Sequence, residues 1–160
     1  MKKLVVASIT AAAIALAASG ASAMGSSSSA PAAAPSTEET YRKAVEAVEA
    51  GQFRTAVGLL NKVVEEKPRH PDALNYLGFS HRKLGDYAQA VSYYQRALAL
   101  EPDHRGANEY LGQAYVELGN LSGAGERLAV LERVCGTDCE EYRTLKTSID
   151  AAKAAAAKQG

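Results

Sequence analysis

Residues 77–102 read LGFSHRKLGDYAQAVSYYQRALALEP, and their pattern of small, aromatic and turn residues returns thirty-four positions later. The later copy begins at Leu111-Gly112 and ends at Gly136, where a proline would fall. A fainter earlier copy runs from Lys43-Ala44 to Pro68. A period of about 34 residues is typical of helix-turn-helix units that bury their apolar faces by stacking on one another. The sequence therefore predicts a stack of three helical hairpins.

Small residues recur at equivalent places in the two helices of each copy and predict a close approach of the paired helices. In chain order they are Ala44, Ala56, Gly78, Ala90, Gly112 and Ala124. A glycine and a polar residue stand between the helices of a pair, as in Gly85-Asp86 and Gly119-Asn120. This order predicts a left-handed helix end followed by a cap for the next helix.

These residues resemble the tetratricopeptide repeat. The resemblance implies an all-α fold, a right-handed superhelical solenoid of three hairpins with a C-terminal capping helix. We expect repeats at about 37–70, 71–104 and 105–138, and a capping helix at about 138–157. The expected helices cover 38–50, 53–66, 71–84, 87–100, 105–118, 121–134 and 138–157. The stretch from the cysteines to Tyr142 also looks like that of small exported bacterial members of the family.

Two S/T-x-x-E patterns predict helix starts, because such a capping box satisfies free backbone N–H groups. The first is Ser36 with Glu39, and the second is Thr137 with Glu140. Behind the second, apolar residues at helical spacing predict a stripe that faces the array: Tyr142, Leu145, Ile149 and Ala152. Glu141 falls on the opposite face, and the tail 151–158 has little to pack and should fray.

The N-terminus has the pattern of a secretory signal peptide over residues 1–23. A basic start precedes the apolar run Leu4–Ala18, and Ala21-Ser22-Ala23 is a small-residue cleavage site. The run has 15 residues, fewer than the roughly 20 that span a bilayer, so we expect no stable membrane anchor after cleavage. An Ala/Ser/Pro-rich linker follows at 24–36 and should be disordered. We expect a periplasmic location, with secretion as the alternative, for a domain at 37–157.

Charge and motifs exclude several function classes. The chain has 18 basic and 18 acidic residues, and there is no basic stripe with interleaved aromatics, so nucleic acid is not an expected partner. No nucleophile motif, phosphate loop or specific metal pattern is present, so we expect no enzymatic activity and no cofactor. His70 and His104 precede the second and third units as capping or solvated residues rather than metal ligands.

The family resemblance implies a concave groove lined by the first helices, which holds a peptide or another protein. The groove candidates are Tyr41, Val45, Asn75, Phe79, Arg82, Lys83, Glu109 and Gln113. Phe79 is either an exposed binding anchor or a packing residue against Tyr41 or Val45. Asn75 and Arg82 fit part of the set with which some members grip a C-terminal carboxylate, whereas Val45 and Gln113 leave that set incomplete. The array associating with itself is a further hypothesis.

Cys135 and Cys139 stand where the third repeat should close. We favour a structural disulfide that fixes the last helix, because an exported chain enters an oxidising compartment. Two alternatives stay open. Cys139 near a helix N-terminus would have a stabilised thiolate suited to thiol exchange, and two thiolates could bind cuprous copper. A thiol-redox or copper-handling envelope protein is therefore the second hypothesis beside a non-catalytic binding scaffold.

Overall fold

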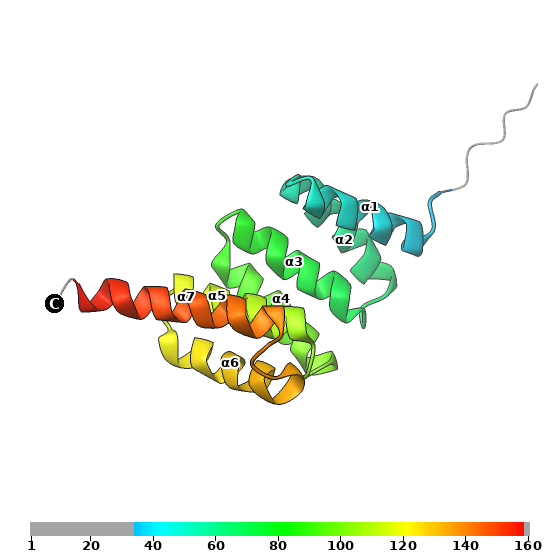
Figure 1. The fold of residues 1–160 in the computed structure, drawn as a ribbon. Helices are drawn as coiled ribbons and strands as arrows, with labels where there is room; N and C mark the ends of the chain where they lie inside the picture. The colour runs from blue at the N-terminus through cyan, green and yellow to red at the C-terminus, as the bar shows by residue number, and fades with distance from the viewer. Residues whose placement is uncertain (1–33, 159–160) are drawn as a thin grey trace, which may run out of the picture. The chain divides into compact units, whose positions relative to one another are not determined.

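The computed structural model describes residues 34–158, which form seven α-helices and no strand (Figure 1). Three hairpins follow one another, each made of two antiparallel helices: α1 (Thr37–Glu49) with α2 (Phe53–Glu66), α3 (Pro71–Lys83) with α4 (Tyr87–Leu100), and α5 (Arg105–Glu117) with α6 (Leu121–Cys135). Helix α7 (Glu140–Ala157) packs on the third hairpin. The all-α solenoid prediction is confirmed, and each helix edge lies within two residues of the expected one.

Part of the predicted domain organisation falls on residues that the structure does not describe. The predicted signal peptide, 1–23, lies entirely outside the described residues, as does the predicted linker up to residue 33. Among the helices of residues 34–158, none combines the length and the apolar character that a bilayer crossing requires.

Side-chain caps start five of the seven helices. Ser36 Oγ accepts a hydrogen bond from a backbone N–H of α1 at 3.1 Å, and Asp86 and Asn120 do the same for α4 and α6. His70 and His104 accept through Nδ1 at the starts of α3 and α5. The caps predicted at Ser36, Asp86 and Asn120 are confirmed, and both histidines take the capping role that the sequence analysis proposed for them.

A glycine with positive φ ends the first helix of each hairpin. The φ angles are 70°, 83° and 75° at Gly51, Gly85 and Gly119. Any residue with a Cβ would be strained in this left-handed region. The glycine therefore lets the chain reverse within two residues and bring the second helix back along the first.

The small residues lie where helices nearly touch, as predicted. A Cβ at Gly78 would lie 2.6 Å from the Tyr94 ring of the same hairpin. A Cβ at Gly112 would collide with Leu145 on α7. The alanines of the pattern, Ala44, Ala56, Ala90 and Ala124, are 0 % exposed. Since Gly112 receives a side chain from α7, this helix packs closely on α5.

The predicted capping box at Thr137 and Glu140 is wrong. Helix α7 begins at Glu140, and its N-cap is Cys139, which makes no side-chain capping hydrogen bond. Cys139 is disulfide-bonded to Cys135 and has an extended backbone, with φ −72° and ψ 152°. The cross-link therefore places the cap two residues after Thr137, which lies in the turn.

Helix α7 buries the predicted stripe. Leu145 and Ile149 join the core cluster of the third hairpin, and Tyr142 packs partly buried against it. Glu141, expected on the solvent face, is instead only partly exposed, and its carboxylate lies 3.1 Å from Arg105 Nη2 on α5. After Asp150 the helix continues to Ala157, with most of its side chains exposed.

Candidate functional site

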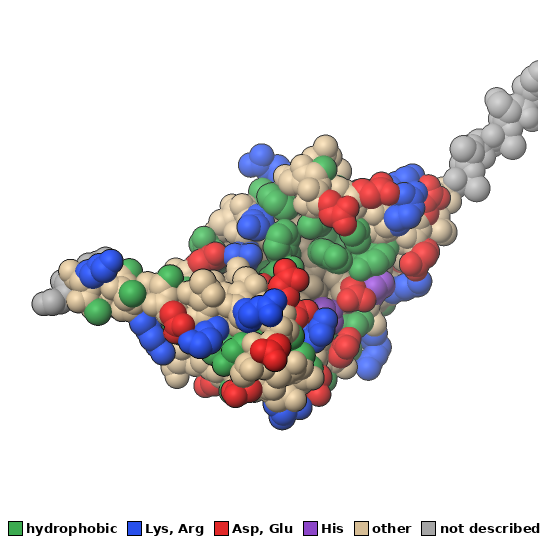
Figure 2. All heavy atoms as spheres, in the orientation of Figure 1, with side chains coloured by type: hydrophobic (Ala, Val, Ile, Leu, Met, Phe, Trp, Pro, Cys, Tyr) green, Lys and Arg blue, Asp and Glu red, His purple; other side chains and the backbone are tan. Residues whose placement is uncertain are grey.

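Helices α1, α3, α5 and α7 lie next to one another and form what we call the inner face of the array (Figure 1). The second helices of the hairpins, α2, α4 and α6, pack behind them. In Figure 2, drawn in the same orientation, hydrophobic side chains gather between α1 and α3, whereas charged side chains cover the region of α5 and α7. All eight predicted groove residues belong to α1, α3 and α5.

Aromatic rings from three helices meet at the centre of the inner face. The Phe79 ring centroid lies 4.9 Å from that of Tyr110 and 6.0 Å from that of Phe53. Phe79 and Tyr110 are only partly buried, so the pair combines packing with an accessible apolar surface. Phe79 thus makes its ring contacts with Phe53 and Tyr110, and within residues 34–158 it makes no ring contact with Tyr41.

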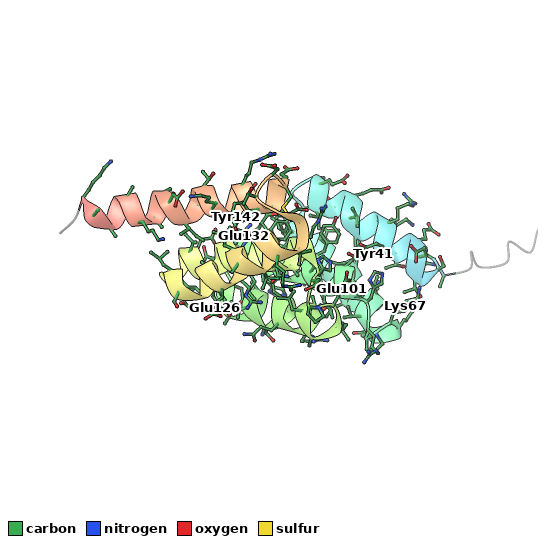
Figure 3. The ribbon with its side chains drawn as sticks, turned by 60° about the horizontal axis from the view of Figure 1, so that its bottom comes forward. Tyr41, Lys67, Glu101, Glu126, Glu132 and Tyr142 are labelled. Carbon is green, nitrogen blue, oxygen red and sulfur yellow. A yellow bond between two sulfur atoms is a disulfide. The ribbon has the colours of Figure 1, made fainter. Side chains whose placement is uncertain are left out.

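Tyr41 belongs to a second aromatic group at the α1 end of the inner face. Its ring centroid lies 4.6 Å from that of His70 and 6.3 Å from that of Tyr76. Figure 3 shows Tyr41 between α1 and the helices that follow it. Burial raises the pKa of Tyr41 and of Tyr76 above that of a free phenol, so both hydroxyls stay protonated. A shallow hollow of about 590 Å³ along α1 is lined by Tyr41 and Val45, among others.

Arg82 lies on the inner face but is not a free charge. It is 7 % exposed, and its Nη1 donates to Glu117 Oε1 at 2.7 Å. Its guanidinium carbon lies 5.6 Å from the centre of the Phe79 ring and 6.0 Å from that of the Tyr110 ring. Arg82 therefore ties α3 to α5 and supports the aromatic pair. Lys83 is exposed, with its Nζ 5.3 Å from the centre of the Phe79 ring.

Glu109 and Asn75 provide buried polar atoms on the same face. Glu109 is 9 % exposed and accepts a hydrogen bond from Gln113 Nε2 at 2.7 Å. Burial, together with the nearby carboxylates Glu141 and Glu140, raises the pKa of Glu109 to about 7 against the opposing effect of Arg82. Asn75 is 5 % exposed, and its Oδ1 finds no hydrogen-bond donor among residues 34–158.

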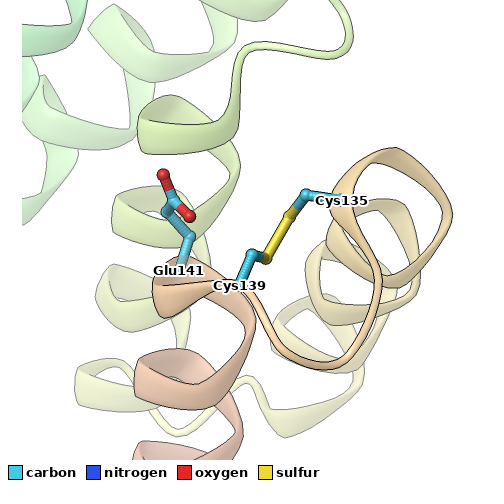
Figure 4. A group of neighbouring side chains, drawn as sticks. All are labelled: Cys135, Cys139 and Glu141. Atoms are coloured by element: carbon cyan, nitrogen blue, oxygen red, sulfur yellow. A yellow bond between two sulfur atoms is a disulfide. The ribbon is translucent and has the colours of Figure 1, made fainter.

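Cys135 and Cys139 join the end of α6 to the start of α7 (Figure 4). They form a disulfide with a Cα–Cα distance of 5.9 Å. One carboxylate oxygen of Glu141 and the two sulfurs lie within 4.8 Å of one another. Because the sulfurs are bonded to each other, neither is a thiolate that could bind a metal or attack a disulfide. Metal binding or thiol exchange would require reduction of this bond.

The structure divides the eight predicted groove residues into three groups. Tyr41 and Val45 lie beside the α1 hollow, and Phe79, Arg82 and Lys83 lie around the aromatic pair. Asn75, Glu109 and Gln113 provide polar atoms on α3 and α5. Three further residues shape the surface without having been singled out for it: Phe53, Tyr110 and Glu141. For Tyr110 a signal exists in the sequence, because it is the repeat equivalent of Tyr76 and precedes the same Leu-Gly pair.

Two family models described as tetratricopeptide repeat match residues 41–79 and 81–149. No curated protein matches the sequence.

Three solved structures illustrate the structural likeness. The first TPR of Spaghetti (RPAP3), bound to HSP90 peptide SRMEEVD, is 19% identical over 74% of this chain and 93% of that chain, with a TM-score of 0.67. The Yersinia enterocolitica type III secretion chaperone SycD, in complex with a peptide of the translocator YopD, is 16% identical over 77% and 94%, with a TM-score of 0.63. A thermophilic TPR protein of Thermus thermophilus is 25% identical over 76% and 66%, with a TM-score of 0.66.

Proposed function

Because the chain belongs to the tetratricopeptide-repeat family, we propose that it is a non-catalytic scaffold that binds a peptide segment of a partner protein on its inner face. The observation that carries this proposal is the partly exposed aromatic pair Phe79 and Tyr110 at the centre of that face. Aromatic side chains held rigidly by packing are favoured binding anchors, because they bury much area at a small entropic cost.

The shape of the surface supports a peptide as the ligand. The hollow along α1 and the aromatic pair lie on neighbouring first helices, so an extended or helical segment could contact both. Helices fixed by a shared core form a preorganised surface, which lowers the entropic cost of binding. Two of the similar structures, RPAP3 and SycD, hold a peptide.

The proposal includes export to an oxidising compartment, the bacterial periplasm. The pattern over residues 1–23 supports this location, and so does the disulfide between Cys135 and Cys139, because such bonds persist in oxidising compartments. Expression of the full chain in a Gram-negative bacterium should yield a periplasmic product that begins at Met24 by intact mass. An uncleaved product in the cytoplasm would contradict the location and leave the binding function untouched.

Selection from a displayed random-peptide library against the full chain tests the binding function. Val45→Arg with Gln113→Arg places two long cationic side chains on the inner face at partly buried positions, and it should abolish capture of the selected peptides. Ser92→Arg adds the same side chain at an exposed position of the outer helix α4 and should capture them as the wild type does. Equal capture by the wild type and both variants would show that the peptides bind outside the inner face.

The alternative function is thiol-redox or copper handling by Cys135 and Cys139. The observation in its favour is the Glu141 oxygen close to both sulfurs. Thiol titration of the native chain, with and without reductant and then with cuprous ion, separates the two functions. The scaffold proposal expects no free thiol before reduction and no copper bound to the native protein. Copper uptake by the native chain, lost in Cys135→Ser with Cys139→Ser, would favour the alternative.

A further inference from the structure

Two acceptor side chains on the inner face, Asn75 on α3 and Glu109 on α5, are served only in part by donors of residues 34–158. Glu109 and Asn75 occupy equivalent positions of successive repeats, thirty-four residues apart. Glu109 is contacted by a neutral amide, that of Gln113, and within residues 34–158 no basic side chain forms an ion pair with it. The Oδ1 of Asn75, on the neighbouring helix, is buried without a donor in that same part of the chain.

Most basic side chains on this part of the inner face are already engaged, although Lys83 beside Phe79 forms no ion pair within residues 34–158. Arg82 bonds through Nη1 to Glu117 at 2.7 Å, while its buried Nε has no acceptor among the described residues. Arg105 pairs with Glu141 at 3.1 Å. Arg143 donates to the backbone carbonyl of Asp138 at 2.7 Å. His104 lies 3.0 Å from Asp72 while it caps α5. Rearranging any of these groups to serve Glu109 would break an existing contact, so a donor is most readily supplied by a ligand.

The local charge also sets the sign of that ligand. Glu140 and Glu141 at the start of α7 act on Glu109 as like charges, so an approaching carboxylate would be repelled. A buried carboxylate without a cation costs free energy, and a cation that reaches it recovers part of that cost. A guanidinium presents several N–H donors in one plane and can serve a carboxylate and an amide oxygen together.

We propose that the inner face selects a peptide segment with a basic side chain, preferably arginine, whose cationic group binds Glu109 and Asn75 while a neighbouring apolar side chain packs on Phe79 and Tyr110. The acceptor pair and the aromatic pair come from the same two stretches of α3 and α5, because Tyr110 directly follows Glu109 and Phe79 lies one turn after Asn75. This inference rests on the proposed function and specifies its ligand.

The test uses peptides selected against the full chain. We expect arginine or lysine to be enriched at one position of the selected peptides. Isothermal titration should show about a tenfold or greater loss of affinity, equivalent to about 1.4 kcal/mol, when that arginine is replaced by its neutral analogue citrulline. Glu109→Gln should lower the affinity for the original peptide by a similar factor. It should show little further loss of affinity for the citrulline peptide, since the interaction of the carboxylate with the arginine is already absent.

Glu126→Gln is the matched control. It makes the same chemical change at an exposed position of the outer helix α6 (Figure 3), and it should bind both peptides as the wild type does. Thermal unfolding of Glu109→Gln followed by circular dichroism verifies that the variant is folded.

Each other outcome overturns the inference in a distinguishable way. Selected peptides without a basic residue, or with acidic residues or a required free carboxylate, would overturn it and leave the proposed function standing. If the replacement of arginine by citrulline lowers the affinity of Glu109→Gln as much as that of the wild type, the cationic side chain of the peptide does not bind at Glu109. Failure to select any peptide would overturn both the inference and the proposed function.

Discussion

At the scale of single residues, the contact of Gly78 with Tyr94 decides how closely α3 and α4 approach. Tyr94 is 0 % exposed, and its ring occupies the volume that a Cβ on Gly78 would need. Gly58 on α2 is the useful contrast, because it is exposed and a Cβ there would meet nothing within 4 Å. The two glycines carry the same helix-propensity cost and differ in their packing.

We therefore expect Gly78→Ala and Gly58→Ala to change stability in opposite directions. Gly78→Ala should destabilise the fold by about 1–3 kcal/mol because the tightly packed ring must move. Gly58→Ala should stabilise it by about 0.5–1 kcal/mol through helix propensity alone. Urea unfolding midpoints measure both changes. A midpoint for Gly78→Ala at or above that of the wild type would show that α3 and α4 are not in close contact there.

Glu109 links the stability of the fold to pH. Its pKa is raised from an ordinary value of 4.5 to about 7 by burial and by Glu141 and Glu140, against Arg82. Between these values the folded state binds more protons than the unfolded state, so the free energy of unfolding decreases as pH rises through this window. Glu109→Gln keeps the shape of the protonated acid and removes the titration.

The expected result is a stabilisation by Glu109→Gln that depends on pH. The variant should unfold close to the wild type at pH 5 and be more stable at pH 8 by about 1–3 kcal/mol. Thermal melts of both proteins at the two pH values, with Glu126→Gln as control, measure this difference. A variant that is destabilised equally at both pH values would mean that the Glu109 carboxylate stabilises the fold in its charged form.

At the scale of elements, the disulfide fixes where α7 begins and how it leaves α6. The bond closes a loop of five residues, Cys135 to Cys139. The first turn of α7 carries Glu141, which pairs with Arg105, and the second buries Leu145 beside Gly112. Loss of the disulfide should therefore weaken the contacts between α7 and α5 and have a smaller effect on the contacts within the first two hairpins.

Cys135→Ser with Cys139→Ser should lower stability by about 2 kcal/mol on the chain-entropy model. The change should appear in hydrogen exchange as faster exchange of the amides of α7 around Leu145 and Ile149, with α1 to α4 unchanged in the native state. Removal of residues 153–160 is the control, since the described side chains there are exposed, and it should leave the exchange of these amides unchanged. Equal protection in the cysteine variant and the wild type would assign the disulfide no part in holding α7.

How far the sequence predicts the elements depends on whether their determinants are local. Gly85 and Asp86 predict a turn and a cap because a left-handed residue and a capping carboxylate act on their own backbone. Thr137 with Glu140 has an equally good local pattern and fails, because the bond from Cys135 to Cys139 places the helix start by a contact outside that pattern. The sequence contained both cysteines, but not the backbone geometry that their bond imposes.

At the scale of the whole molecule, the repeat period predicts which helices face inward, but not how their side chains pair. Arg82 on α3 bonds to Glu117 on α5, and the Phe79 ring contacts that of Tyr110 rather than that of Tyr41. Both outcomes depend on the angle and spacing between stacked hairpins, which small residues such as Gly112 set through contacts distant in sequence. The sequence therefore predicts which residues lie on the inner face. It does not predict which of their side chains are paired within the protein and which remain available to a ligand.

Amide NMR spectra of the ¹⁵N-labelled full chain can detect a partner segment that lies across α1, α3 and α5. Spectra recorded with and without a selected peptide should show the largest shift changes in these helices, with Phe79, Glu109 and Tyr110 among the most affected residues. Ser92 and its neighbours on α4 should stay unchanged. Shift changes confined to α2, α4 and α6 would place the ligand on the outer helices and contradict the account.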